Sequence, residues 1–371
     1  MINIGERIRS ERVMAELTQK ELAEKAGYKN YQTILNMENG QRKVKISDLN
    51  KISKALNLSM DYFLDTQKEA VPALWRDRKN EKECNILSNR LRNYLKNYSH
   101  LKEFLNEEYT PFVPKSADDL KSKYINLLNR SKFEFAGKLA SDFRKDNSLG
   151  MYPADSLIKI IKELDILIFS FDLKGYGSAA SLVNEHGAGI LLNKENAPWR
   201  QYFDIAHELF HIITWKLFDF SLEENNLTDN DRVEKYANAF AASLLMPQSV
   251  LKNKAAKYQT GNNEIDRRFI IENAIKFNVS TDAFISRLEF LHLINKKQKK
   301  EFQESLDKIE YWKKAIDSVE HITDDEYPNE YLMLVYKAYT EERISKMKLA
   351  KYLNKNIGEI DHYLKKKELV A

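Results

Sequence analysis

Residues 200–215 read RQYFDIAHELFHIITW, and they carry the strongest structural pattern in the chain. Two histidines, His207 and His211, stand four positions apart, with Glu208 between them and mostly apolar residues around them. At about 3.6 residues per turn, this spacing places both imidazoles on one face of a helix. The stretch therefore predicts a largely apolar helix that presents two nitrogen ligands side by side.

This spacing suits a metal centre. Two imidazoles on one helical face can bind a single zinc ion. Glu208 projects about 100° round the helix, where a carboxylate can take a proton from water and later return it to a leaving amine. The alternative is a core helix with satisfied histidines, because three fixed positions also arise by chance.

A catalytic zinc needs a third protein ligand. The longer pattern that adds Gly and His beyond the first pair is absent, since Thr214 and Leu217 stand at those positions. Residues 233–247 read VEKYANAFAASLLMP and show a helical apolar face. Glu234 could complete a His, His, Glu set, and Asn238, one turn later, could orient a ligand. Otherwise, Glu234 is a solvated acid near the start of a helix.

The two segments RQYFDIAHELFHIITW and EKYANAFAASLLMP together resemble the ImmA/IrrE family of zinc metallopeptidases. The resemblance spans about residues 133–290 and rests on two separate motifs in the right order. It implies Zn²⁺ as cofactor, with His207, His211 and Glu234 as ligands. It also implies Glu208 as general base.

The sequence upstream of residue 200 predicts the rest of a small core. Helices are expected through residues 134–145 and 153–164, a strand at 165–173, a glycine-containing loop at 175–181 and an apolar strand at 187–193. Helix, strand, strand, helix is the order of a small mixed α+β core. The family resemblance further implies that residues 187–193 form an edge strand on which an extended substrate could lie.

The first 64 residues indicate a separate helical unit. Apolar residues recur at helical spacing, Thr18 suits the start of a second helix, and Gly27 suits its end. A third short helix should close at Asn39 and Gly40, and a fourth should follow within residues 46–64. Short helices with a glycine turn between the second and third are typical of a helix-turn-helix domain.

The segments TQKELAEKAG, MENG and QRK resemble the Xre family of DNA-binding domains over residues 4–64, which implies double-stranded DNA as partner. The implied contacts are a phosphate for Gln19 and the major groove for Asn30, Tyr31, Gln32, Thr33 and Asn36. Arg42, Lys43 and Lys45 suit the DNA backbone. The alternative is a module that binds protein, because the basic excess is small: residues 1–64 contain 11 Lys and Arg and 8 Asp and Glu, a net charge of +3.

Composition limits the remaining possibilities. The 371 residues, 43% hydrophobic and 31% charged, describe several soluble and mostly helical units. No apolar run approaches the roughly 20 residues of a membrane span, and the charged start does not resemble a signal peptide, so a cytoplasmic location is expected. The single cysteine, Cys84, excludes an internal disulfide and is expected to be buried.

These patterns predict a mainly α protein with a small α+β zincin-like core, an N-terminal all-α domain and a helical C-terminal region. The expected parts are an Xre-type domain at 1–66, a helical linker or stalk at 67–132, a zinc peptidase domain at 133–290 and a helical interaction region at 291–371.

Three further features have expected roles. Trp75 in the linker is expected to serve packing, and His292 is expected to lie in the core. Residues 344–364, ISKMKLAKYLNKNIGEIDHYL, show a helix-turn-helix-like pattern and are treated as an interaction or homodimer element.

The expected function is a DNA-binding transcriptional regulator with a zinc-dependent endopeptidase domain, which cleaves a repressor or another regulatory protein. One rival is a non-proteolytic repressor or antitoxin whose zincin-like domain is a metal-stabilised sensor. Glu208 argues against that rival, because metal binding alone does not require it. A third possibility is a peptidase whose N-terminal domain only recruits protein.

Overall fold

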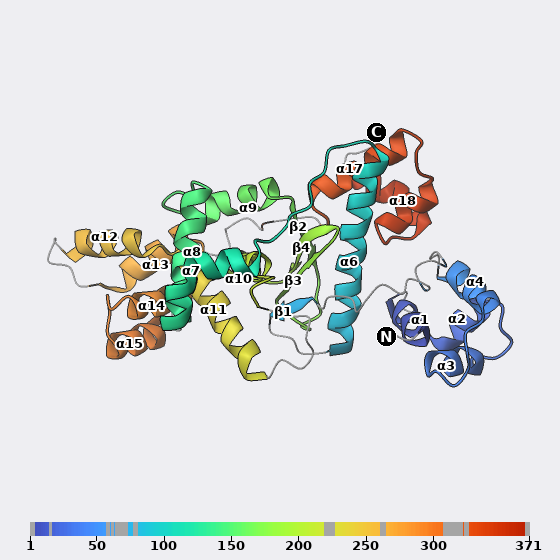
Figure 1. Ribbon diagram of the computed structural model, residues 1–371, viewed down its shortest axis with the longest axis horizontal. Coiled ribbons are helices and arrows are strands. Elements are labelled where there is room, and N and C mark those ends of the chain that lie inside the picture. The colour runs from blue at the N-terminus through green and yellow to red at the C-terminus, as the bar shows by residue number, and fades with distance from the viewer. Residues whose placement is uncertain are drawn as a thin grey trace. The chain divides into compact units, whose positions relative to one another are not determined.

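The computed structural model describes residues 4–14, 17–56, 60, 63, 73–76, 81–218, 227–259, 265–306, 322 and 326–367 (Figure 1). They divide into two compact units: one holds the N-terminal helices together with residues 85–90 and the described residues from Tyr339 onward, and the other holds the sheet and the helices around it. The predicted mainly α fold with a small mixed core is confirmed. Within the described ranges, every helix is too short or too polar to span a bilayer. The predicted border between residues 66 and 67 lies outside those ranges.

The N-terminal helices have the predicted order. They are α1 (Ile4–Met14), α2 (Gln19–Lys25), α3 (Gln32–Glu38) and α4 (Ile46–Ala55). Thr18 caps α2: its side chain accepts a hydrogen bond from the Glu21 amide, and the Glu21 carboxylate accepts one from the Thr18 amide. Gly27 ends α2 with φ +73°, a conformation that favours glycine. Leu58, expected in the fourth helix, lies outside the described residues.

One four-stranded sheet forms the centre of the larger unit. Its strands are β1 (Leu74–Arg76), β2 (Ile166–Phe171), β3 (Ala179–Asn184) and β4 (Gly187–Asn193), in the order β1-β3-β4-β2. Strand β3 pairs antiparallel with β1 and β4, and β4 pairs parallel with β2.

The prediction of an edge strand at residues 187–193 is wrong. Strand β4 is hydrogen-bonded on both sides, to β3 and β2, and all its residues are buried. A strand that is covered on both faces has a continuous apolar sequence. Such a sequence does not show whether the strand lies at the edge or in the middle of the sheet. Gly189 allows the close packing, since a Cβ there would lie 3.0 Å from the Leu91 side chain.

Two strands were missed by the sequence analysis. Strand β3 begins inside the expected loop at 175–181. It was not predicted because alanine has a low strand propensity, although Ala179 and Ala180 are both fully buried. Strand β1 is three residues long and lies in the expected charged linker. Trp75 does serve packing there, since a Cβ on Gly177 would lie 2.6 Å from its ring.

The remaining helices surround the sheet or follow it in the chain. They are α6 (Glu81–Phe104), α7 (Ala117–Arg130), α8 (Lys132–Asp146), α9 (Ala154–Glu163), α10 (Pro198–Ile213), α11 (Leu227–Leu245), α12 (Gln248–Gln259), α13 (Arg267–Lys276), α14 (Thr281–Phe290), α15 (Lys296–Leu306), α17 (Asn329–Thr340), α18 (Lys346–Tyr352) and α19 (Ile360–Lys366), with a 3-10 turn, η1 (Ile357–Glu359), before α19. Cys84 is buried as predicted. His292 is not in the core: it ends α14 with φ +57° and is exposed, so that prediction is wrong.

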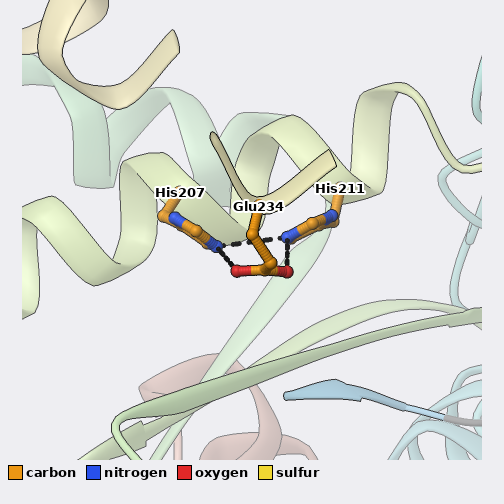
Figure 2. A group of neighbouring side chains, drawn as sticks. All are labelled: His207, His211 and Glu234. Atoms are coloured by element: carbon orange, nitrogen blue, oxygen red, sulfur yellow. Dashed lines mark hydrogen bonds and ion pairs between the residues drawn. The ribbon is translucent and has the colours of Figure 1, made fainter. Parts of the chain in front are cut away.

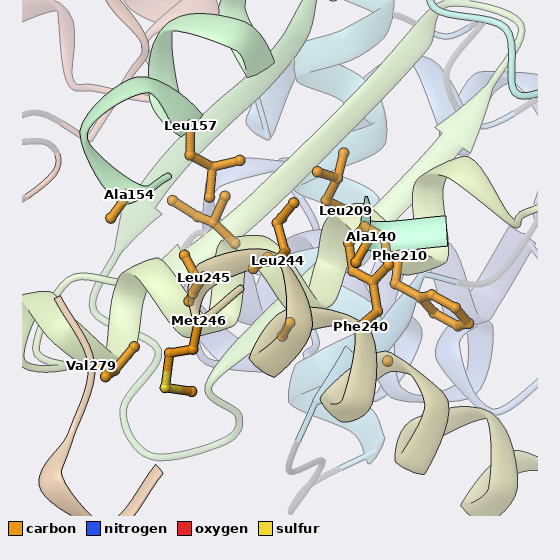
Figure 3. Packing of buried hydrophobic residues seen from close by; sticks show 14 of the residues in the cluster. Ala140, Ala154, Leu157, Leu209, Phe210, Phe240, Leu244, Leu245, Met246 and Val279 are labelled. Atoms are coloured by element: carbon orange, nitrogen blue, oxygen red, sulfur yellow. The ribbon is translucent and has the colours of Figure 1, made fainter. Parts of the chain in front are cut away.

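The main core lies between the sheet and helices α8 to α11 (Figure 3). Side chains of α8, α9, α10 and α11 meet there with Met246, which follows α11, and Val279, which follows α13. They include Ala140, Leu157, Leu209, Phe210, Phe240 and Leu244. The opposite face of the sheet is covered by aromatic residues, with Tyr94 of α6 stacked on Phe169 at 4.8 Å between ring centroids. This burial fixes α10 against β3 and β4, and α11 against α10.

Candidate metal centre

Three predicted ligands converge where α11 packs on α10 (Figure 2). His207 and His211 lie one turn apart on α10, with their Nε2 atoms 3.2 Å from each other. Glu234 reaches them from α11, with Oε2 3.0 Å from His207 Nε2 and Oε1 3.1 Å from His211 Nε2. The imidazoles are buried, whereas the Glu234 side chain is 38% exposed, so solvent reaches one side of the group.

These separations fit a tetrahedral zinc ion. Nitrogen and oxygen ligands about 2.0–2.2 Å from one zinc lie about 3.3 Å from one another at tetrahedral angles. The two imidazole nitrogens lie 3.2 Å apart, and each lies 3.0–3.1 Å from a different oxygen of Glu234, so one ligand atom from each residue can face a common point. Two nitrogens and a carboxylate are also donors that zinc accepts. The residues present therefore fit the ion, with one coordination position left for water or substrate.

Asn238 lies where it can fix the orientation of the first imidazole. Its Oδ1 is 3.1 Å from His207 Nδ1. Because an amide oxygen only accepts hydrogen bonds, Nδ1 carries the hydrogen and Nε2 keeps the lone pair that a metal ion needs. The predicted position of Asn238, one helical turn after Glu234, places it beside the ligands.

Glu208 faces a different partner on the sheet. Ser181 of β3 donates a hydrogen bond of 2.6 Å to Glu208 Oε2, and both residues are fully buried. The other oxygen, Oε1, is buried and has no hydrogen-bond partner among the described residues. The carboxylate is therefore oriented by one contact and keeps one oxygen free for a proton-bearing group such as water. The sequence did not indicate Ser181.

The charges at this site follow from burial and from the pairing with Glu234. Burial lowers the pKa of His207 to about 4 and raises the pKa of Glu208 to about 7. Burial also acts to lower the pKa of His211, but contact with Glu234 outweighs it and the pKa rises. Burial alone would raise the pKa of Glu234, yet its bonds to both imidazoles hold it below the usual value.

A buried polar network connects β1 to α10, about one helical turn before His207. Arg76 of β1 forms an ion pair with Asp204 of α10, whose side chain is fully buried. Asp204 also accepts hydrogen bonds of 2.8 Å from Ser178 and 3.0 Å from Asn196. The Arg76 guanidinium lies 5.0 Å from the Phe203 ring centroid. The sequence pattern did not predict this network, although an aspartate within an apolar helix such as α10 indicates a buried partner.

Four of the residues predicted to contact DNA have internal side-chain partners: Gln19, Arg42, and Asn30 with Gln32. The Gln19 amide donates to buried Glu38 at 2.7 Å, and Arg42 pairs with Asp48 at 3.3 Å. Asn30 accepts a bond from the Gln32 amide at the start of α3. Other predicted contacts are exposed or half-buried around α3 and after it, namely Tyr31, Thr33, Asn36, Lys43 and Lys45. Their roles toward DNA stay predictions.

Two segments of the chain match known families. A peptidase family described as the IrrE N-terminal-like domain matches residues 161–289, and a helix-turn-helix family matches residues 8–63. No curated protein matches the sequence. The chain therefore joins an Xre-like helix-turn-helix domain to an ImmA/IrrE-type metallopeptidase-like domain.

Proposed function

We propose that the chain is a transcriptional regulator whose IrrE-like domain is a zinc-dependent endopeptidase that cleaves a repressor or another regulatory protein. The observation that carries the proposal is the convergence of His207, His211 and Glu234 beside a buried Glu208. The helix-turn-helix domain supports the DNA-binding half of the proposal. A cytoplasmic location and pairing with a second copy are parts of the same proposal.

Each residue of the centre has a distinct task in this proposal. His207, His211 and Glu234 would hold the zinc, which when bound supplies a Lewis acid for the peptide carbonyl. Glu208 accepts the proton of the attacking water and passes it to the amine of the broken peptide bond. Without a metal ion, burial raises the pKa of Glu208 to about 7, and the positive charge of a bound zinc would favour the ionised form that accepts the proton. Ser181 and Asn238 hold Glu208 and His207 in orientation through the bonds described above.

Incubation of the purified chain with cell extract tests this function. We expect a new protein fragment that disappears when a chelator is added and returns when zinc is restored, because the ligand set would be empty without metal. A non-proteolytic repressor or antitoxin would give the same protein bands with and without chelator. A fragment that persists in chelator would also contradict the proposal, because a zinc-free chain would then be cleaving.

A further inference from the structure

Helices α18 and α19 repeat the local structure of the N-terminal helix-turn-helix motif. The first helix of each motif, α2 or α18, is seven residues long and starts after a hydroxyl side chain that caps it. Thr18 accepts a bond from Glu21 N, and Ser345 accepts one from Lys348 N, both at 3.2 Å. Equivalent residues stand 327 positions apart, and the pairs are Thr18 and Ser345, Leu22 and Leu349, Ala23 and Ala350, and Gly27 and Asn354.

The turn after each first helix has the same backbone bonds. In each motif, three successive amides bond to three carbonyls of the preceding helix. The bonds are Ala26 N to Leu22 O, Gly27 N to Glu24 O and Tyr28 N to Ala23 O in one motif, and Leu353 N to Leu349 O, Asn354 N to Lys351 O and Lys355 N to Ala350 O in the other. Gly27 and Asn354 both have positive φ, +73° and +45°. The turn geometry is thus the same, with asparagine in place of glycine. The same three bonds also close α6, α8, α13 and α14, so the likeness of the two motifs rests on the cap and the apolar residues at the 327-residue offset.

The second helix of the C-terminal motif has one buried side and one exposed side. Ile360 and Leu364 are buried; at the same offset Leu364 corresponds to buried Met37 of α3, whereas buried Ile34 corresponds to exposed Asp361. The exposed positions of α19 are Asp361, His362, Lys365 and Lys366. None of these four is a large apolar residue of the kind that anchors a helix in a protein groove. The exposed side of α19 is therefore polar and basic.

The charge of the C-terminal motif is concentrated. Residues 343–367 contain eight Lys and Arg against two Asp and Glu, a net charge of +6. Glu341, Glu342 and Glu368 flank this stretch, so residues 339–371 as a whole carry +3, the same net charge as the first 64 residues. One of the two acids, Asp361, is paired with Lys346 at 2.6 Å, which joins α18 to α19. A basic helix pair with an uncovered second helix suits the phosphates and major groove of a duplex.

We propose that α18 and α19 form a second DNA-binding element, with the exposed side of α19 against double-stranded DNA. The family match to a helix-turn-helix domain covers residues 8–63, so this element is additional to it. The proposal does not depend on peptidase activity. It gives the regulator two sites for duplex DNA on one chain.

The test measures how salt weakens binding of the full chain to a labelled mixed-sequence duplex. The variant Lys365→Ala with Lys366→Ala should bind more weakly and reduce the slope of log K against log salt by about 2, because each lost phosphate contact removes about 0.9. Replacing both residues by Arg keeps the charge and should keep the slope. Both lysines are exposed, so the circular dichroism spectrum should not change.

Two further variants make the result specific. Lys297→Ala with Lys300→Ala removes the same charge from α15, where both side chains are at least 80% exposed, and should leave the slope unchanged. Arg42→Ala with Lys43→Ala tests the N-terminal domain separately. If the α19 variant behaves like the α15 control, the second element does not exist, whatever the N-terminal variant does. An unchanged slope with altered self-association of the chain would assign α19 to a protein contact and overturn the proposal.

Discussion

Replacing Glu208 by Gln should reduce cleavage of the protein substrate by about a thousandfold and leave the zinc content unchanged. Glutamine has nearly the same shape and can still accept the bond from Ser181, but it cannot take a proton from water. General-base catalysis contributes roughly 10²–10⁴-fold to such reactions, which sets the size of the loss. Because Glu208 is outside the ligand set, metal binding should not suffer.

The measurement is the rate at which the chelator-sensitive fragment appears in extract, with zinc determined on the same samples. Glu195→Gln is the matched control, because it makes the same chemical change at an exposed position after β4. The control should cleave at the wild-type rate. Wild-type cleavage by the Glu208 variant would show that another group is the base, and loss of zinc would show that the carboxylate contributes to the ligand set.

Replacing Arg76 by Met should destabilise the sheet-containing unit by about 3–5 kcal/mol, the usual cost of leaving a buried charge without its partner. Burial raises the pKa of Asp204, and the positive charge of Arg76 is the largest effect that opposes this rise. Without Arg76, Asp204 must either stay charged in the interior or take up a proton. Either outcome weakens the attachment of β1 to α10, the helix that carries both histidines.

Urea unfolding of the variant measures this loss. Adding Asp204→Asn to the Arg76→Met chain should recover much of the stability, because the buried negative charge is removed while Ser178 can still donate to the amide oxygen. Lys159→Ala is the control: it breaks an exposed pair with Glu163, and exposed pairs of this kind contribute at most about 1 kcal/mol. An Arg76 variant as stable as that control would mean that the ion pair does not hold β1.

The helical part of the site could be predicted because helical spacing is regular. Residues four apart on a helix must share a face, so the sequence alone predicts that His207 and His211 lie side by side, as they do on α10. The apolar face of residues 233–247 predicted that α11 would pack against its neighbours, which brings Glu234 to the histidines. Thr18 and Gly27 fixed the ends of α2 because capping and positive φ are local properties of the chain.

The sheet order and the polar network could not be predicted, because they depend on contacts distant in sequence. Arg76 meets Asp204 across 128 positions, and no local pattern relates the two. Strands β2 to β4 are buried on both faces, so alternation of polar and apolar residues is missing and the edge cannot be recognised. Ser181 is a single small residue whose importance follows only from its distance to Glu208.

Zinc content of the purified wild type beside a His207→Ala variant tests the metal centre most directly. The proposed ligand set predicts one zinc per wild-type chain and a large loss of zinc in the variant, because two remaining ligands hold the ion poorly. A wild-type chain without stoichiometric metal, or a variant that retains it, would contradict the proposed centre and with it the peptidase.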